Sequence, residues 1–129
     1  MITVRIHRKK QLASALVPFN LIVNDDIEKV KNAVKNKNLT EVIKTVNLYP
    51  IKTDQTVAFN VNGDSIKIAA INNNFDNNIF YPFAMSEEII LNDNQDLLLE
   101  QTKAMVKVKI ELNKVNNLEN ANNIIEHNL

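Results

Sequence analysis

The stretch from residue 57 to residue 71 constrains the fold most, because hydrophobic and polar residues alternate on both sides of the chain's only glycine. The pair Asn62-Gly63 suits a two-residue type I′ turn, in which both central residues have positive φ. Such a turn fixes a register that brings four apolar side chains to one face of the ribbon: Val57, Phe59, Ile66 and Ile68. The sequence therefore predicts a β-hairpin with one buried face.

A chain of 129 residues is long enough for one domain with its own core. We expect that domain to span residues 1–115, and we expect the polar residues 116–129 to form a frayed or marginally helical tail. The absence of cysteine excludes disulfides, thiolate metal sites and thiol nucleophiles. The two histidines lie near opposite ends of the chain, which argues against a Ser-His-Asp triad. We expect no cofactor.

Alternating apolar residues also predict strands elsewhere in the chain. The clearest are residues 2–8, 19–24 and 105–113, and shorter ones are expected at 87–91 and 96–100. Residues 97–106 are also compatible with a helix, so the sequence leaves both structures open there.

The spacing of the apolar residues changes to that of a helix after residue 24. Ile27, Val30 and Val34 recur on one helical face, behind a pair with the spacing of a capping box, Asp25 and Glu28. Residues 39–46 repeat this arrangement, but their β-branched members favour a strand, so both structures stay open there as well.

Several alternating strands together with one or two helical segments are typical of a mainly β fold. We expect an antiparallel sandwich or a partial barrel with one or two short helices, and an α+β fold is the alternative. No internal repeat and no Pro/Gly/Ser-rich linker divides the chain.

Charge is balanced over the whole chain but unevenly distributed along it. Residues 1–53 carry ten Lys and Arg against four Asp and Glu, and residues 54–129 carry five against eleven. The outer faces of the first strand and of the late strand are basic, and adjacency in a sheet would join them into an anion-binding patch of Arg5, His7, Lys9, Lys107 and Lys109. Neither strand offers an aromatic residue for base stacking, which argues against nucleic acid. Lysine also guards exposed strands against aggregation, and that simpler role is favoured.

Aromatic residues gather in the middle of the chain. More than half of the seven lie within nine residues, close to a methionine. Such side chains contribute disproportionately to protein interfaces, so an exposed segment would form an interaction site from Phe75, Phe80, Tyr81, Phe83 and Met85. A buried segment would instead cover an open end of the sheet, and we favour burial.

Metal binding is not indicated. Asn92, Asn94 and Asp96 have the alternate spacing that opens a calcium loop. However, Leu97 replaces the required glycine and Lys103 the bidentate glutamate.

A basic start followed by an apolar run at residues 12–23 has superficial features of a signal peptide. The residues before the run alternate as in a strand, and Pro18 and Asn20 interrupt it. The run is also far shorter than the ~20 residues of a membrane span. We therefore expect a cytoplasmic protein without a membrane span, with secretion as the disfavoured alternative. The 22 asparagines are consistent with an AT-rich genome.

The opening of the chain combines a basic first strand, a small-residue bend at residues 13–15 and a second strand that ends at Asn24. In these features it resembles small all-β bacterial proteins of unknown function. The resemblance covers about the first fifth of the chain, and the helical segment from Asp25 onward departs from it. It implies a bacterial β protein and carries over no functional residue.

Together these features predict a binding or assembly module rather than an enzyme. We expect protein–protein association, with another protein or as a homo-oligomer, through an exposed strand edge or the aromatic segment. An anion or nucleic-acid binder that uses the basic strand face is the alternative. A hydrolase built from carboxylates that the fold brings together ranks third.

Overall fold

The structure is a computed structural model that describes residues 1–72, 84–104, 107–118 and 123–129. Sheet A contains β1 (Ile2–Arg8), β4 (Thr56–Val61), β7 (Gln95–Ala104), β8 (Lys107–Val115) and β9 (Ile124–Asn128). Sheet B contains β2 (Phe19–Val23), β3 (Tyr49–Ile51), β5 (Ile66–Ile71) and β6 (Ile89–Leu91). The helical elements are α1 (Asp25–Asn36), α2 (Leu39–Val42) and two short 3-10 turns, η1 (Leu12–Ser14) and η2 (Ile43–Thr45).

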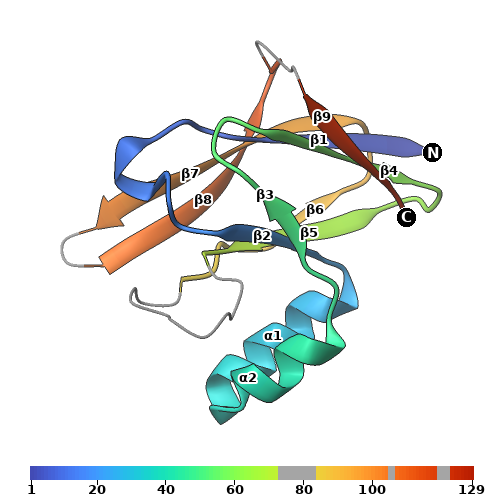
Figure 1. The fold of residues 1–129 in the computed structure, drawn as a ribbon. Coiled ribbons are helices and arrows are strands. Elements are labelled where there is room, and N and C mark those ends of the chain that lie inside the picture. The colour runs from blue at the N-terminus through green and yellow to red at the C-terminus, as the bar shows by residue number, and fades with distance from the viewer. Residues whose placement is uncertain (73–83, 105–106, 119–122) are drawn as a thin grey trace.

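The elements are arranged in three layers (Figure 1). Sheet A, in the order β8–β7–β1–β4–β9, packs on sheet B, in the order β3–β2–β5–β6, and α1 and α2 lie beyond sheet B. The main hydrophobic core lies between the sheets, and a smaller one lies between sheet B and the helices. The predicted mainly β sandwich with short helices is confirmed, and the described residues form no closed barrel.

The antiparallel arrangement predicted from the sequence holds for sheet B, whereas sheet A is mixed. In sheet A, β1 runs parallel to β7 and β4 runs parallel to β9. Parallel neighbours cannot be joined by a tight turn, because the chain must first return to the starting edge. Here the returning chain passes through sheet B.

The predicted hairpin around the only glycine is wrong. β4 pairs with β1 and β9 in sheet A, while β5 pairs with β2 and β6 in sheet B. Residues 62–65 therefore carry the chain from one sheet to the other, and neither Asn62 nor Gly63 has positive φ. The expected burial was nevertheless correct, because the apolar sides of both strands enter the same core. Alternation fixes which face a residue occupies, but not which strand its neighbour is.

Phe59 lies at the centre of the main core and has no exposed surface. Its ring meets Tyr49 of β3 edge to face, with a centroid distance of 5.1 Å, and His127 of β9 at 5.7 Å. Aromatic pairs at such distances add about 0.5–1.5 kcal/mol beyond the area they bury. One ring thus ties an inner strand of sheet A to an edge strand of each sheet.

β2 is buried on both faces, and so is β5 except at Lys67, which explains their nearly continuous apolar sequences. Leu21, Ile68 and Ala70 face the main core. The residues that directly follow each of them along its strand face α1. Helix α1 covers that outer face with Ile27, Val30 and Ala33.

The first predicted helix is confirmed as α1, but two of its details differ. Ala33 takes the buried position expected for Val34, which is 43% exposed. Asn24 precedes the first helical residue and makes no side-chain cap bond, so the predicted capping box at Asp25 does not form. The segment left open between strand and helix is helical in α2 and η2.

The end of the chain is a strand and not the predicted frayed or marginally helical tail. β9 runs parallel to β4, and the Leu129 N–H donates to the Asn60 carbonyl at 2.9 Å. The five residues of β9 are too few and too irregular to show a period of their own, so their structure depends on the ladder with β4. No helix that the structure describes is long and apolar enough to cross a membrane.

Candidate functional site

β8 forms one edge of sheet A and is the longest edge strand among the described residues. There it pairs only with β7, in a continuous antiparallel ladder that joins Asp96 with Val115 and Ala104 with Lys107. Every second residue of an edge strand points its N–H and C=O groups away from the sheet. An edge of this length is a template for pairing with another strand.

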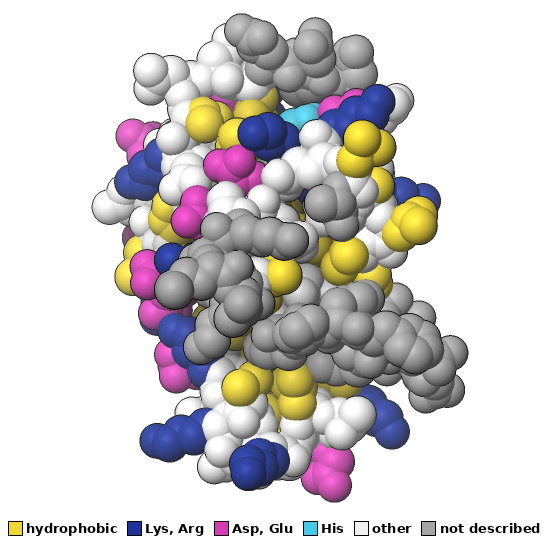
Figure 2. Space-filling view, turned by 90° about the vertical axis from the view of Figure 1, so that its left-hand side faces the viewer, with side chains coloured by type: hydrophobic (Ala, Val, Ile, Leu, Met, Phe, Trp, Pro, Cys, Tyr) yellow, Lys and Arg dark blue, Asp and Glu magenta, His cyan; other side chains and the backbone are white. Residues whose placement is uncertain are grey.

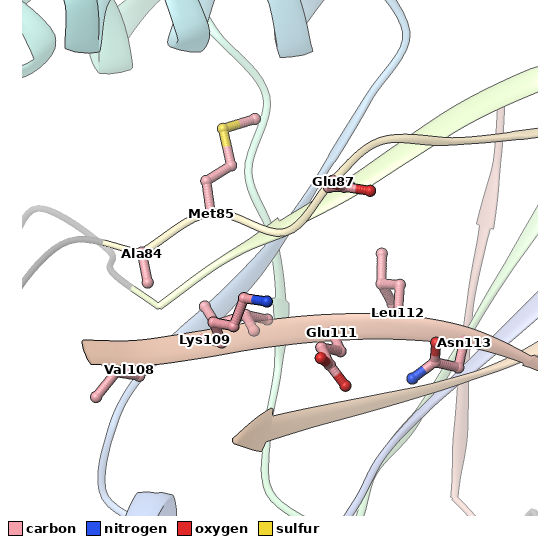
Figure 3. Close-up of a pocket in the computed structure, with 9 residues that line it drawn as sticks. Ala84, Met85, Glu87, Val108, Lys109, Glu111, Leu112 and Asn113 are labelled. Atoms are coloured by element: carbon pink, nitrogen blue, oxygen red, sulfur yellow. The ribbon is translucent and has the colours of Figure 1, made fainter. Parts of the chain in front are cut away.

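The side chains of β8 divide between its two faces. Ile110 is buried in the main core, and Leu112 packs against that core. Figure 3 shows Leu112 pointing toward the segment that contains Glu87, while Glu111 points to the other side of the strand. Lys109 is exposed and Glu111 is partly exposed. β8 therefore offers an apolar and a charged face beside its open backbone.

Residues 84–87 form the opposite wall of this site, and β5 holds them in place. The Ser86 N–H donates to the Ala70 carbonyl at 2.8 Å, and the Ala70 N–H donates to the Ser86 hydroxyl, also at 2.8 Å. The Ala84 N–H donates to the side chain of Asn72 at 2.8 Å. These bonds continue the pairing along β5 beyond the part that β6 covers, and they hold residues 84–87 in place.

A groove lies between the β8 edge and this wall (Figure 3). Its volume is about 370 Å³, and it is lined by Ala84, Met85, Glu87 and the β8 residues from Val108 to Asn113. Met85 and Glu87 also line a neighbouring hollow that reaches Lys31 of α1. Lys31 pairs with Glu88 at 3.5 Å, so the helix layer supports the same segment. The open edge of β8 is thus bordered by a preformed groove.

Of the predicted aromatic interaction site, only its last residue lies within the described residues. Met85 packs against the smaller core, and Figure 3 shows its side chain pointing away from β8. The other four members lie outside the described residues: Phe75, Phe80, Tyr81 and Phe83.

The two basic strands are not neighbours, because β7 lies between β1 and β8. The adjacency that was to join their cations into one patch is therefore wrong. Lys109 is exposed on β8, and Lys107 is placed only by its backbone in that strand.

The three predicted anion-binding residues at the start of the chain each lie beside a carboxylate. Arg5 binds Asp96 through two hydrogen bonds of 2.8 and 2.6 Å, and this contact raises the pKa of Arg5. Lys9 lies 3.4 Å from Glu100, and His7 lies 3.2 Å from Asp54, in each case between nitrogen and oxygen. Figure 2 likewise shows positive and negative side chains interspersed on the face that it draws.

A signal for two of these pairs was present in the sequence. Arg5 and Lys9 are four residues apart, as are Asp96 and Glu100. Two strands with that common spacing match charge for charge when they pair in parallel, as β1 and β7 do.

This pairing predicts weak retention on immobilised heparin. Because carboxylates neutralise Arg5 and Lys9, we expect the protein to elute below about 0.15 M salt, where exposed charges separated by more than ~8 Å are already screened. Asp96→Asn should delay elution by releasing Arg5, and Asp93→Asn, an exposed change nearby, serves as the matched control. Strong retention of the unmodified protein would support the anion-binding alternative instead.

The described residues contain no group of three or more His, Asp or Glu that could hold a metal ion.

Sequence interpretation also missed a buried cation. Arg8, which belongs to the basic cluster at the start of the chain, is only 2% exposed. The alternation along β1 indicates this burial, since Arg8 follows Ile2, Val4 and Ile6 on the inner face.

No protein family, curated protein or solved structure matched this chain.

Proposed function

We propose that this protein is a non-catalytic assembly module that forms a homodimer by pairing β8 with the β8 strand of a second copy. The observation that supports this proposal is the open β8 edge beside the groove at residues 84–87. Strand addition at a free edge gains affinity from main-chain hydrogen bonds and specificity from alternate side chains. The sequence expectations set this assembly in the bacterial cytoplasm.

The sequence of β8 is complementary to itself in one antiparallel register. A two-fold axis at Ile110 places Lys109 opposite Glu111 of the second copy, and the symmetry repeats this pair. The same register places Val108 opposite Leu112 and Ile110 opposite its own copy. Charged residues thus meet charged residues of opposite sign on one face, and apolar residues meet on the other.

The neighbouring in-phase register is less favourable. An axis at Glu111 would place two glutamates directly opposite each other and would pair Lys109 with Asn113. Like charges in opposite positions destabilise a strand pair. The axis at Ile110 is therefore the register that we propose.

Charge reversal on β8 tests this interface. Lys109→Glu would place two glutamate pairs where the proposed dimer has two ion pairs, each exposed pair contributing about 0.2–1 kcal/mol. We expect the variant to weaken the dimer by about 2 kcal/mol, which corresponds to about a 30-fold higher dissociation constant. Light scattering and sedimentation across a concentration series would measure it.

The double variant Lys109→Glu/Glu111→Lys exchanges the charges and restores both pairs, so it should recover most of the affinity. Lys67→Glu on β5 is the matched control, because it reverses an exposed strand lysine that is not on β8. A monomeric unmodified protein at about 0.1 mM, or a double variant no better than the single one, would contradict the proposal. The dimer should weaken only slightly as salt rises, whereas phosphate binding would weaken steeply.

A further inference from the structure

A second cavity, with a different lining, lies where residues 15–18, which follow the η1 turn, meet β2 and β3. Its volume is about 450 Å³, within the range of about 300–1,000 Å³ that is typical of small-molecule sites. Most of its lining is apolar and includes Leu16, Val17, Pro18, Phe19 and Pro50. The cavity could therefore hold an apolar group of modest size. Figure 2 looks at the side of the molecule where this turn lies, at the left of Figure 1.

Arg8 contributes a positive charge to the wall of this cavity. Its side chain is 98% shielded from water, and its guanidinium lies 4.0 Å from the centre of the Phe19 ring. Nη1 donates to the Ile51 carbonyl at 3.0 Å, and Nη2 donates to the carbonyls of Ser14 at 2.6 Å and Val17 at 2.9 Å. All of these partners are neutral, and no carboxylate of the described residues pairs with Arg8.

Two polar atoms of residues that line the cavity also lack a hydrogen-bond partner. They are Nε of Arg8 and the hydroxyl of Thr53, and both are shielded from water. Leaving a buried polar group unsatisfied costs about 1–3 kcal/mol, and more for a charged group. Burial also lowers the pKa of Arg8, although a guanidinium remains a cation at neutral pH.

A purely structural role accounts for part of this arrangement. The three carbonyl bonds tie the η1 turn and β3 to β1, as a cross-link would. That role leaves the free Nε donor, the free Thr53 hydroxyl and the missing counter-charge unexplained, and all three belong to residues that line one cavity.

We propose that this cavity binds a small aliphatic carboxylic acid, with the carboxylate beside Arg8 and Thr53 and the hydrocarbon chain against Leu16, Pro18 and Pro50. The carboxylate supplies the missing charge, and attraction between opposite charges is strong where water is excluded. Because Nε is shielded from water, the carboxylate reaches it as residues 15–18 move outward. The apolar walls select against small hydrophilic anions.

Octanoate, octanol and acetate distinguish the contributions of charge and chain, and calorimetric titration of the full chain measures each. We expect octanoate to bind one site at least about tenfold more tightly than octanol, since a charge-assisted hydrogen bond gives about 1.4 kcal/mol or more over a neutral one. Acetate should bind still more weakly. Amide resonances of Leu16, Val17 and Thr53 should shift on addition of octanoate.

Substitution at the rim tests the site without removing Arg8, whose loss could unfold the turn. Leu16 is 99% exposed, so Leu16→Glu should leave the fold intact and weaken octanoate binding about tenfold by repulsion. Leu16→Lys should retain binding. Leu12→Glu is the matched control, because Leu12 is 97% exposed four residues earlier in the chain but does not line the cavity.

Thr53→Val provides a second test inside the cavity, and we expect it to weaken octanoate more than octanol. Equal affinities for octanoate and octanol, or equal losses in Leu16→Glu and Leu12→Glu, would overturn the proposal. Because these residues lie away from β8, the dimerisation measurement and this titration can fail independently.

Discussion

Phe59→Ala is expected to destabilise the protein by about 3–5 kcal/mol, the usual cost of removing a large buried aromatic side chain. Phe59 has no exposed surface, and its ring contacts both Tyr49 and His127. The substitution removes these contacts and leaves a cavity between the sheets, where strands on both sides restrict collapse. Because domains are stable by only about 5–15 kcal/mol, the variant should be close to unfolding at 37 °C.

Urea denaturation followed by circular dichroism measures this effect. Ile90→Ala is the matched control, since Ile90 lies on edge strand β6 with 58% of its surface exposed and should change stability by less than about 1 kcal/mol. Phe59→Leu, which keeps much of the buried volume, should fall between the two variants. A loss below about 1 kcal/mol in Phe59→Ala would contradict the central position of this ring.

Arg8→Met should destabilise the protein by about 3 kcal/mol. Methionine retains much of the apolar volume but removes the donors to the carbonyls of Ile51, Ser14 and Val17, and hydrogen bonds to charged groups contribute about 1.5–3 kcal/mol each. Relief from burying a cation offsets part of this loss. The turn and β3 should loosen first, because two of the carbonyls belong to residues 14–17.

Arg5→Met is the comparison that isolates burial. Arg5 has the same side chain on the same strand, but it is one-third exposed and pairs with Asp96. This pair is only part-buried, with 33% of the Arg5 side chain and 15% of the Asp96 side chain exposed, so its loss should cost about 1 kcal/mol, less than the loss of Arg8. Hydrogen exchange would show whether amides of residues 14–17 lose protection only in Arg8→Met. Equal stabilities of the two variants would mean that the carbonyl bonds of Arg8 contribute little.

Burial in most strands follows from the local pattern of apolar residues. Ile2, Val4 and Ile6 alternate, and each occupies the core as its parity requires. The same local rule gave β8 its apolar and charged faces, and it extended to Arg8. These properties follow from a period of two residues, which depends only on the backbone of the strand itself.

Strand pairing, in contrast, depends on contacts between distant parts of the chain. Phe59 and Ile66 enter one core whether they form a hairpin or face each other across a sandwich, so the pattern around Gly63 could not separate the two arrangements. β9 forms because β4 offers it an edge, and a strand of five residues carries no period that would reveal this in advance.

The candidate sites have the same division. The opposite charges of Lys109 and Glu111 can be seen in the sequence. They are available for pairing with a second copy only because the order of sheet A leaves β8 at an edge. The charge of Arg8 is likewise visible in the sequence, whereas the cavity beside it is assembled by β1, β2, β3 and the segment 15–18. Pairing and cavities join residues that are distant along the chain, and no local period encodes such contacts.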